Sequence, residues 1–201
     1  MEIWNIRMKA MKKYLWELVK LFNRRQIIMI KPSMKCNLKC SYCSVNWHTG
    51  APPEYYEYNY QYWINLIFRE QPKMVAISGG EPGIYEDLHK IVNYCVSRKI
   101  LVQIVTNLTC IDEYVKIKPS WRVTFWSTYH HASRAKSFEL LYDYLKKRFH
   151  ITVKELESPK IFPFSRLTPL KTEFTNTIYP YKIFAPNGKV FYSCYEIDKN
   201  E

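Results

Sequence analysis

Short apolar runs alternate with amphipathic helical patterns along most of this chain of 201 residues. The runs that predict strands cover 26–32, 73–78, 100–107, 121–128 and 151–157. The segments that predict helices cover 58–70, 84–99 and 137–149, with a short helix near 111–117. Because strands that alternate with helices build βαβ units, the pattern predicts an α/β fold with a mostly parallel sheet. Five or six strands are too few to close an eight-stranded barrel, so we expect an open or partial barrel.

The two ends of the chain add elements to this core. Apolar side chains recur at helical spacing through 8–24, which predicts an N-terminal helix that covers one end of the core. The basic face of this helix leaves a membrane-surface role as the alternative. Near the other end, "YKIFAPNGKVFYSC" (181–194) predicts a β-hairpin with Asn187 and Gly188 at its turn. The run 160–164 is a weaker strand prediction because it contains a proline.

We therefore divide the chain into three regions. Residues 1–25 are expected to form an N-terminal helical extension, 26–165 the partial-barrel core, and 166–201 a C-terminal extension whose hairpin packs on the core. No apolar stretch comes close to the roughly 18 residues that a membrane span needs. Residues 1–25 carry charges too often for a secretory signal. Three of the six cysteines are crowded and three lie far apart, which indicates a reducing cytoplasm rather than a secreted disulfide framework.

The formal net charge of +12 raises the question of a nucleic-acid partner. Of the 30 basic residues, 21 are lysine and nine are arginine, and no stripe of arginines with interleaved aromatic residues is present. This profile favours a solvated basic surface over a nucleic-acid site.

Polar clusters follow the first four predicted strands. They read "SMKCNLKCSYC", "SGGEP", "TN" and "STYHH" in chain order. Because parallel α/β folds bind their ligands at the carboxyl ends of the strands, these clusters mark the expected site.

The first cluster contains three closely spaced cysteines, Cys36, Cys40 and Cys43. A structural zinc site needs four ligands, for which His48 or a distant cysteine would have to serve. A disulfide with a spare thiol does not suit a reducing compartment. The third possibility is an iron–sulfur cluster with three protein thiolates, whose fourth iron keeps an open coordination position.

Two motifs carry a resemblance to a known family. Cys-x3-Cys-x2-Cys after the first strand, with Tyr42 before the last cysteine, resembles the radical S-adenosylmethionine (SAM) superfamily. The "SGGEP" turn at 78–82 is similar to the second motif of that superfamily, and the interval from Cys43 to Gly79 fits one loop, one helix and one strand. The resemblance covers roughly 26–157 and implies a partial (β/α)6-type barrel with mostly parallel strands.

The resemblance implies roles for the residues of both motifs. Cys36, Cys40 and Cys43 would bind a [4Fe–4S] cluster, SAM would bind the open iron, and Tyr42 would lie beside the cluster and the adenine.

The residues of "SGGEP" would contact SAM. Gly79 and Gly80 would let the backbone approach its methionyl group, since neither has a Cβ. Glu81 would accept a hydrogen bond from its amino nitrogen, and Pro82 would stiffen the turn.

The later strand ends are expected to add contacts to SAM. Asn107 resembles the polar position of the family after the third strand, and Ser127 the position after the fourth. His130 or His131 would add a contact to SAM or substrate, whereas Thr106 and Thr128 are interpreted as strand residues. Of the remaining cysteines, Cys95 is predicted to lie in the core, Cys110 to be passive near the cavity, and Cys194 to end the hairpin.

The resemblance implies an enzyme that cleaves SAM reductively to a 5′-deoxyadenosyl radical, which takes a hydrogen atom from a peptide, sugar or other metabolite. An electron donor such as flavodoxin or ferredoxin would reduce the cluster. One alternative is an activase that makes a glycyl radical on a partner protein. The non-enzyme alternative is a basic module whose cysteines bind zinc.

Overall fold

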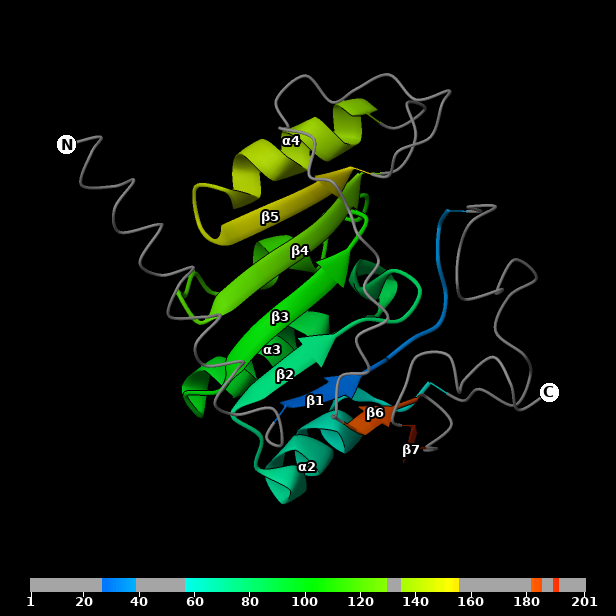
Figure 1. Cartoon of the computed structure of the whole chain (residues 1–201), viewed down its shortest axis with the longest axis vertical. Coiled ribbons are helices and arrows are strands. Elements are labelled where there is room, and N and C mark those ends of the chain that lie inside the picture. The colour runs from blue at the N-terminus through cyan, green and yellow to red at the C-terminus, as the bar shows by residue number, and fades with distance from the viewer. Residues whose placement is uncertain (1–26, 39–56, 130–134, 156–181, 186–189, 192–201) are drawn as a thin grey trace.

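A computed structural model describes residues 27–38, 57–129, 135–155, 182–185 and 190–191 (Figure 1). Its seven strands form one sheet in the order β5-β4-β3-β2-β1-β6-β7. All neighbouring strands pair in parallel except β6 and β7, which are antiparallel. The strands are β1 (Ile27–Ile30), β2 (Met74–Ile77), β3 (Leu101–Thr106), β4 (Val123–Tyr129), β5 (His150–Glu155), β6 (Lys182–Phe184) and β7 (Val190–Phe191).

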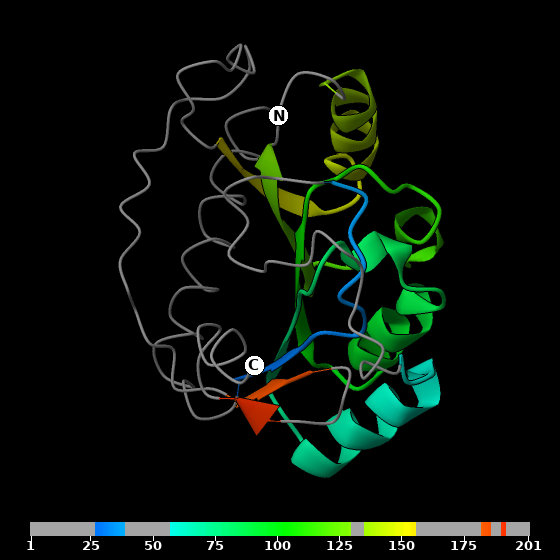
Figure 2. The same cartoon turned by 90° about the vertical axis from the view of Figure 1, so that its right-hand side faces the viewer.

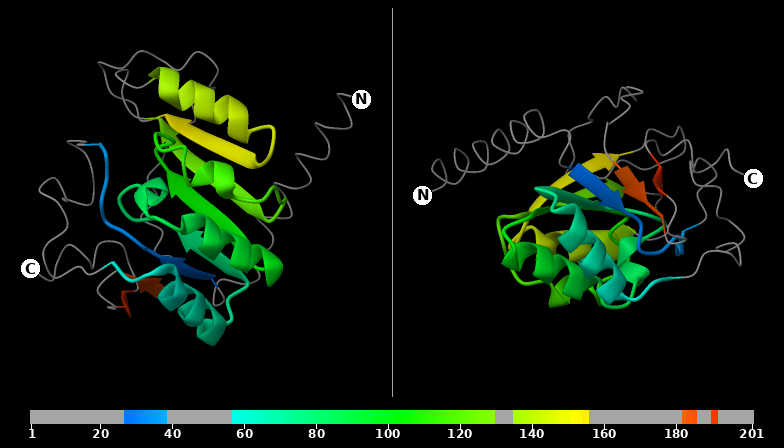
Figure 3. Two further views of the ribbon diagram at one scale, coloured as in Figure 1. Left: turned by 180° about the vertical axis from the view of Figure 1, so that it is seen from behind. Right: turned by 90° about the horizontal axis from the view of Figure 1, so that it is seen from below.

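The described helices all cover the same face of this sheet (Figures 2 and 3). They are α2 (Tyr60–Glu70), α3 (Leu88–Ser97) and α4 (Ala135–Leu145), with short 3-10 turns η2 (Pro82–Ile84) and η3 (Tyr114–Lys116). The N-cap of α2 is Asn59, whose side chain accepts a hydrogen bond from the N–H of Tyr62 at 3.1 Å. No helix within the described ranges is long and apolar enough to cross a membrane.

Alternation along the strands divides their side chains between two faces. Ile28, Val75, Val102 and Phe125 face the helices and belong to one large cluster of buried apolar residues. Their strand neighbours face the opposite side, where smaller clusters form; these neighbours include Ile27, Met29, Met74, Ala76, Leu101 and Ile183. We call the first face the helix face and the second the inner face. Apolar packing on both faces explains why most of the strands read as near-continuous apolar runs.

The structure confirms the five predicted strands and the α/β class, with differences at element ends. The helix predicted over 84–99 begins at Leu88, because 82–84 form a separate turn and Asp87 has a φ of 68°. The hairpin strands form as predicted, and β6 also extends the sheet by pairing with β1. The predicted helix 8–24, the strand 160–164 and the hairpin turn lie outside the described residues.

Candidate functional site

Backbone hydrogen bonds bring the start of the cysteine loop against the glycine-rich turn. The N–H of Ser78 donates to the carbonyl of Ile30 at 3.0 Å, which continues the β1–β2 pairing beyond the strands. The N–H groups of Gly80 and Glu81 donate to the carbonyls of Ser33 (3.2 Å) and Lys35 (2.8 Å). Two segments whose contacting residues are more than 40 positions apart in the printed sequence therefore share one edge of the sheet.

The two glycines are needed for this approach. A Cβ on Gly79 would lie 2.1 Å from the carbonyl oxygen of Ser33, and Gly79 has a φ of +132°, which other residues rarely adopt. A Cβ on Gly80 would lie 2.2 Å from the carbonyl oxygen of Lys35. The sequence analysis expected the glycines to make room for SAM, and the fold already requires them so that two backbone segments can meet.

Glu81 lies inside the protein with no exposed surface. Its Oε1 accepts hydrogen bonds from the N–H of Gly83 (3.1 Å), the hydroxyl of Thr106 (2.6 Å) and the hydroxyl of Tyr114. Its Oε2 accepts one from the N–H of Asn107 at 2.7 Å. Four protein donors therefore already surround the carboxylate that the sequence analysis expected to accept from the SAM amino group.

This enclosure also changes the ionisation of the carboxyl. Burial raises the pKa of Glu81 above its ordinary value, while the hydrogen bonds from Thr106, Tyr114, Asn107 and Gly83 act in the opposite direction. The pKa of Tyr114 is raised well above its ordinary value, first by burial and then by the Glu81 charge. Sequence reasoning missed Tyr114, which lies 33 residues from Glu81 and has no local signal of this contact.

Asn107 lies beside Cys36, as the meeting of strand ends predicts. The Nδ2 of Asn107 is 3.8 Å from the Sγ of Cys36 and donates to Asn37 Oδ1 at 3.1 Å. The Nδ2 of Asn37 donates in turn to the hydroxyl of Thr109 (2.7 Å) and to the Sγ of Cys110 (3.4 Å). Side chains of the cysteine loop and of the turn after β3 thus form one connected network.

The other proposed cluster residues lie outside the described part of the chain. These are Cys40, Tyr42, Cys43, His130 and His131. Among the described residues no group of three or more metal-ligating side chains is present. Cys36 is exposed and is the member of the predicted cysteine set whose surroundings the structure describes.

Ser127, which the sequence analysis expected to contact SAM after the fourth strand, lies on the helix face of the sheet. It pairs in register with Thr106, and cross-strand partners point to the same side of a sheet. The hydroxyl of Thr106 lies 2.8 Å from that of Tyr114 on the helix face, where the neighbouring positions Phe125 and Tyr129 are also packed. By alternation the inner face of β4 presents Trp126 and Thr128 instead. Both are partly exposed, and the sequence analysis had treated Thr128 as a plain strand residue.

Cys95 and Cys110 occupy the positions expected of passive thiols. Cys95 lies on α3 and is fully buried in the apolar core, as predicted, and burial raises its pKa to about 12. Cys110 is partly buried near Gly83, and burial followed by the Glu81 charge raises its pKa to about 11. Both groups therefore favour the protonated thiol at neutral pH. Cys194 lies outside the described residues.

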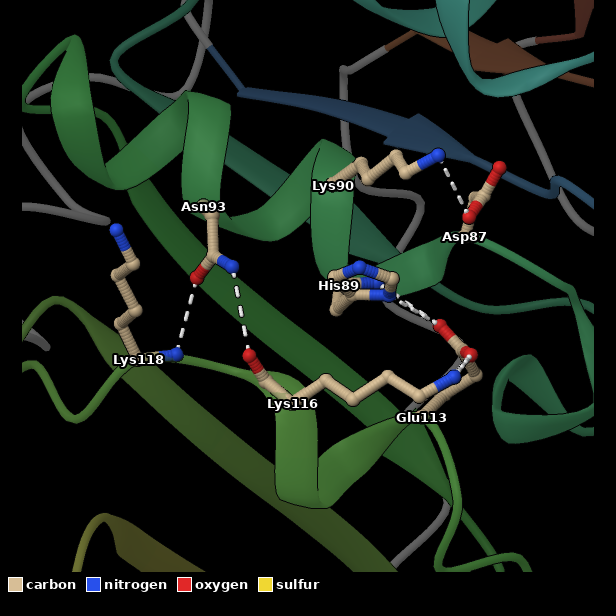
Figure 4. A network of polar contacts seen from close by, with 7 residues as sticks. All are labelled: Asp87, His89, Lys90, Asn93, Glu113, Lys116 and Lys118. Carbon is tan, nitrogen blue, oxygen red and sulfur yellow. Dashed lines mark hydrogen bonds and ion pairs between the residues drawn. The ribbon is translucent and has the colours of Figure 1, made fainter.

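A second polar network ties α3 to the segment after β3 (Figure 4). Glu113 accepts from Lys116 Nζ at 2.6 Å and lies 2.8 Å from Nδ1 of His89. Asn93 joins the same two segments by accepting from the N–H of Lys118 at 3.0 Å. These side chains join α3 to the segment after β3, and we call these two segments the outer layer. The outer layer contains no residue of the cysteine loop or of "SGGEP".

Comparison with known proteins gives a consistent result. A sequence model of the Radical SAM superfamily matches residues 30–155, which is more than half of the chain. Solved structures of SuiB from Streptococcus suis share the fold with a TM-score of 0.52. They are SuiB bound to S-adenosylmethionine (25% identity), SuiB alone (24%) and SuiB bound to the precursor peptide SuiA (21%). The matches cover 67–68% of this chain and 34–35% of SuiB, so the chain spans about a third of the length of SuiB. No curated protein matches.

Proposed function

Because the chain belongs to the radical SAM superfamily, we propose that it uses a [4Fe–4S] cluster and SAM to remove a hydrogen atom from a peptide substrate. Members of this superfamily are enzymes that bind this cluster and SAM. When bound, the cluster supplies one electron to SAM, and the radical chemistry that follows acts on the substrate. The observation that carries the proposal is the backbone docking of the cysteine loop against "SGGEP" at one edge of the sheet.

We assign Cys36, Cys40 and Cys43 to hold the cluster. The surroundings of Cys36 fit this role, because its exposed sulfur lies 3.4 Å from the N–H of Leu38 and 3.8 Å from the Nδ2 of Asn107. N–H donors beside a sulfur favour the thiolate, which is the form that binds iron. Three thiolates leave one coordination position free for SAM.

The remaining assignments combine the family resemblance with the contacts of the described residues. Gly79, Gly80 and Pro82 would offer backbone to SAM, and Tyr42, Asn107 and His130 would lie around it. Glu81 keeps the turn in place through its four hydrogen bonds rather than by touching SAM. The contact first expected of Ser127 passes to Trp126 or Thr128 on the inner face.

The peptide substrate and the electron donor are supported by likeness alone. SuiB has been solved with a precursor peptide, and it shares the fold of this chain. A flavodoxin or ferredoxin would supply the electron. We further propose that 26–165 is the catalytic core, with 1–25 and 166–201 as extensions. The pairing of β6 with β1 supports the packing of the C-terminal extension on that core. Neither the activase nor the zinc-module alternative is favoured by the family match.

The test begins with anaerobic reconstitution of the whole chain. The wild type should bind about four irons with matching sulfide and, once reduced, should convert SAM to 5′-deoxyadenosine. Cys36→Ala should lose the cluster, whereas Cys95→Ala, which alters a core thiol, should keep it. One zinc without sulfide in the wild type would overturn the proposal. A Cys36→Ala protein with a full SAM-responsive cluster would overturn the ligand assignment alone.

A further inference from the structure

The side-chain amide of Asn107 has a defined orientation. Its Oδ1 accepts a hydrogen bond from the backbone N–H of Thr109 at 3.0 Å. A backbone N–H can only donate, so the oxygen of the amide must face Thr109. The NH2 group therefore faces the other way, toward Cys36 Sγ at 3.8 Å and Asn37 Oδ1 at 3.1 Å.

The backbone of Asn107 is held as firmly as its side chain. Its N–H donates to the buried Oε2 of Glu81 at 2.7 Å, and the residue is 6% exposed. The following residue, Leu108, has a φ of 52°, and its N–H donates to the hydroxyl of Thr106 at 2.9 Å. The turn after β3 therefore presents the amide to the cysteine loop in a fixed direction.

From this geometry we infer that Asn107 is a positioning residue that sets the reduction potential of the cluster through an N–H···S hydrogen bond to Cys36. The inference rests on the proposed function, because it takes Cys36 as a cluster ligand. Reduction adds one electron from an external donor to the cluster, and no bond forms or breaks in that step. Donors to the ligand sulfur stabilise the added negative charge, so they raise the potential. Leu38 N–H is a second donor to the same sulfur at 3.4 Å.

The test measures the midpoint potential of the reconstituted cluster by a redox titration followed by electron-spin resonance, without SAM. Omitting SAM separates this role from any contact between Asn107 and SAM. Asn107→Asp keeps the oxygen that faces Thr109 and replaces the NH2 group by a second oxygen. Asn93→Asp makes the same chemical change on α3, where Asn93 contacts Lys116 and Lys118 (Figure 4).

We expect the potential of Asn107→Asp to shift to more negative values, and that of Asn93→Asp to stay close to wild type. Asn107→Leu removes the donor without adding charge and should shift the potential in the same direction by less. The Leu variant decides the matter if the Asp variant does not take up a cluster.

Two outcomes would overturn the inference while leaving the proposed function intact. One is a cluster of unchanged potential in both Asn107 variants. The other is a failure of both variants to assemble a cluster that Cys95→Ala still assembles, because Asn107 would then act in assembly and not on the potential. A wild-type chain that assembles no [4Fe–4S] cluster would instead contradict the proposed function.

Discussion

Two buried carboxylates, Glu81 and Glu113, are held by different kinds of partner. Glu81 has no exposed surface, and Glu113 is 5% exposed. Hydroxyl and backbone N–H groups surround Glu81, and within the described ranges no cation is among its hydrogen-bond partners. Glu113 instead faces the ammonium of Lys116 and the ring of His89 (Figure 4). Both side chains are shielded from solvent, but Glu81 lies deeper in the protein than Glu113, so the depth of burial and the kind of partner both differ.

The two carboxyl groups respond oppositely to these surroundings. At Glu81 burial outweighs the hydrogen bonds, and the pKa is raised. At Glu113 burial also raises the pKa, but the hydrogen bonds from Lys116 and His89 outweigh it, and the net pKa lies below the ordinary value. Neutral donors satisfy a buried carboxylate without compensating its charge, whereas a cation does both. The carboxylate at the edge that carries the motifs is therefore stabilised by directed hydrogen bonds from neutral groups, and the carboxylate in the outer layer by a positive charge as well.

The largest expected effect is the loss of the enclosed carboxylate. Glu81→Ala leaves two hydroxyls and two backbone N–H groups in the interior without an acceptor. Each unsatisfied group costs about 1–3 kcal/mol, and partial relaxation leaves a total loss of about 3–5 kcal/mol in unfolding free energy. Urea denaturation of Glu81→Ala and wild type would measure it. A loss of unfolding free energy no larger than that of Glu113→Ala would contradict the claim that the neutral donors around Glu81 depend on it more than the partners of Glu113 do on theirs.

A smaller effect is expected from removing one neutral donor. Tyr114→Phe deletes the hydroxyl that donates to Glu81 and lies 2.8 Å from the hydroxyl of Thr106. The ring keeps its edge contact with Phe125, so the unfolding free energy should fall by about 1–2 kcal/mol. The same denaturation measurement applies. Tyr94→Phe, a change on α3 in a partly exposed residue, is the matched control and should have little effect.

The outer network should respond still less. Glu113→Ala removes the acceptor of Lys116 and His89, but Lys116 is half exposed and can return to water. We expect a loss of about 1 kcal/mol in unfolding free energy, typical of an ion pair with an exposed partner. If Glu113→Ala destabilises the protein as much as Glu81→Ala does, the exposure of Lys116 to water does not reduce the cost of losing the carboxylate.

Sequence patterns predicted the fold class and the meeting of the two motifs, because both follow from local periodicity and from the rule that parallel strand ends share an edge. They did not predict the pairing of β6 with β1, since no local pattern encodes a partner more than 150 positions away. The enclosure of Glu81 was missed for the same reason, because the hydroxyl of Tyr114 reaches it across 33 residues.

The place of Ser127 on the helix face was not predicted for a different reason, although the sequence held a usable signal. Val123, Phe125 and Tyr129 share its position in the strand alternation and are large and apolar, which marks that side as core. The sequence analysis relied on the polar character of Ser127 at a strand end and did not use this alternation. Asn107 comes one residue after Thr106, and its side-chain nitrogen lies 3.8 Å from the Sγ of Cys36.

The smallest effect is a difference in the pH dependence of the two sites. The folded-state pKa of Glu81 is raised, so its contribution to stability is full below the unfolded value of about 4.3 and declines as pH rises toward the folded value. The folded-state pKa of Glu113 is lowered, so its contribution is full above about pH 4.3 and is lost as pH falls through the folded value. Unfolding free energies of the wild type, Glu81→Gln and Glu113→Gln, measured in urea across this range, separate the two. The stability advantage of wild type over Glu113→Gln should grow with rising pH, while its advantage over Glu81→Gln should shrink. Parallel curves for all three proteins would mean that the two carboxyl groups titrate alike, and that the kind of partner does not distinguish the motif edge from the outer layer.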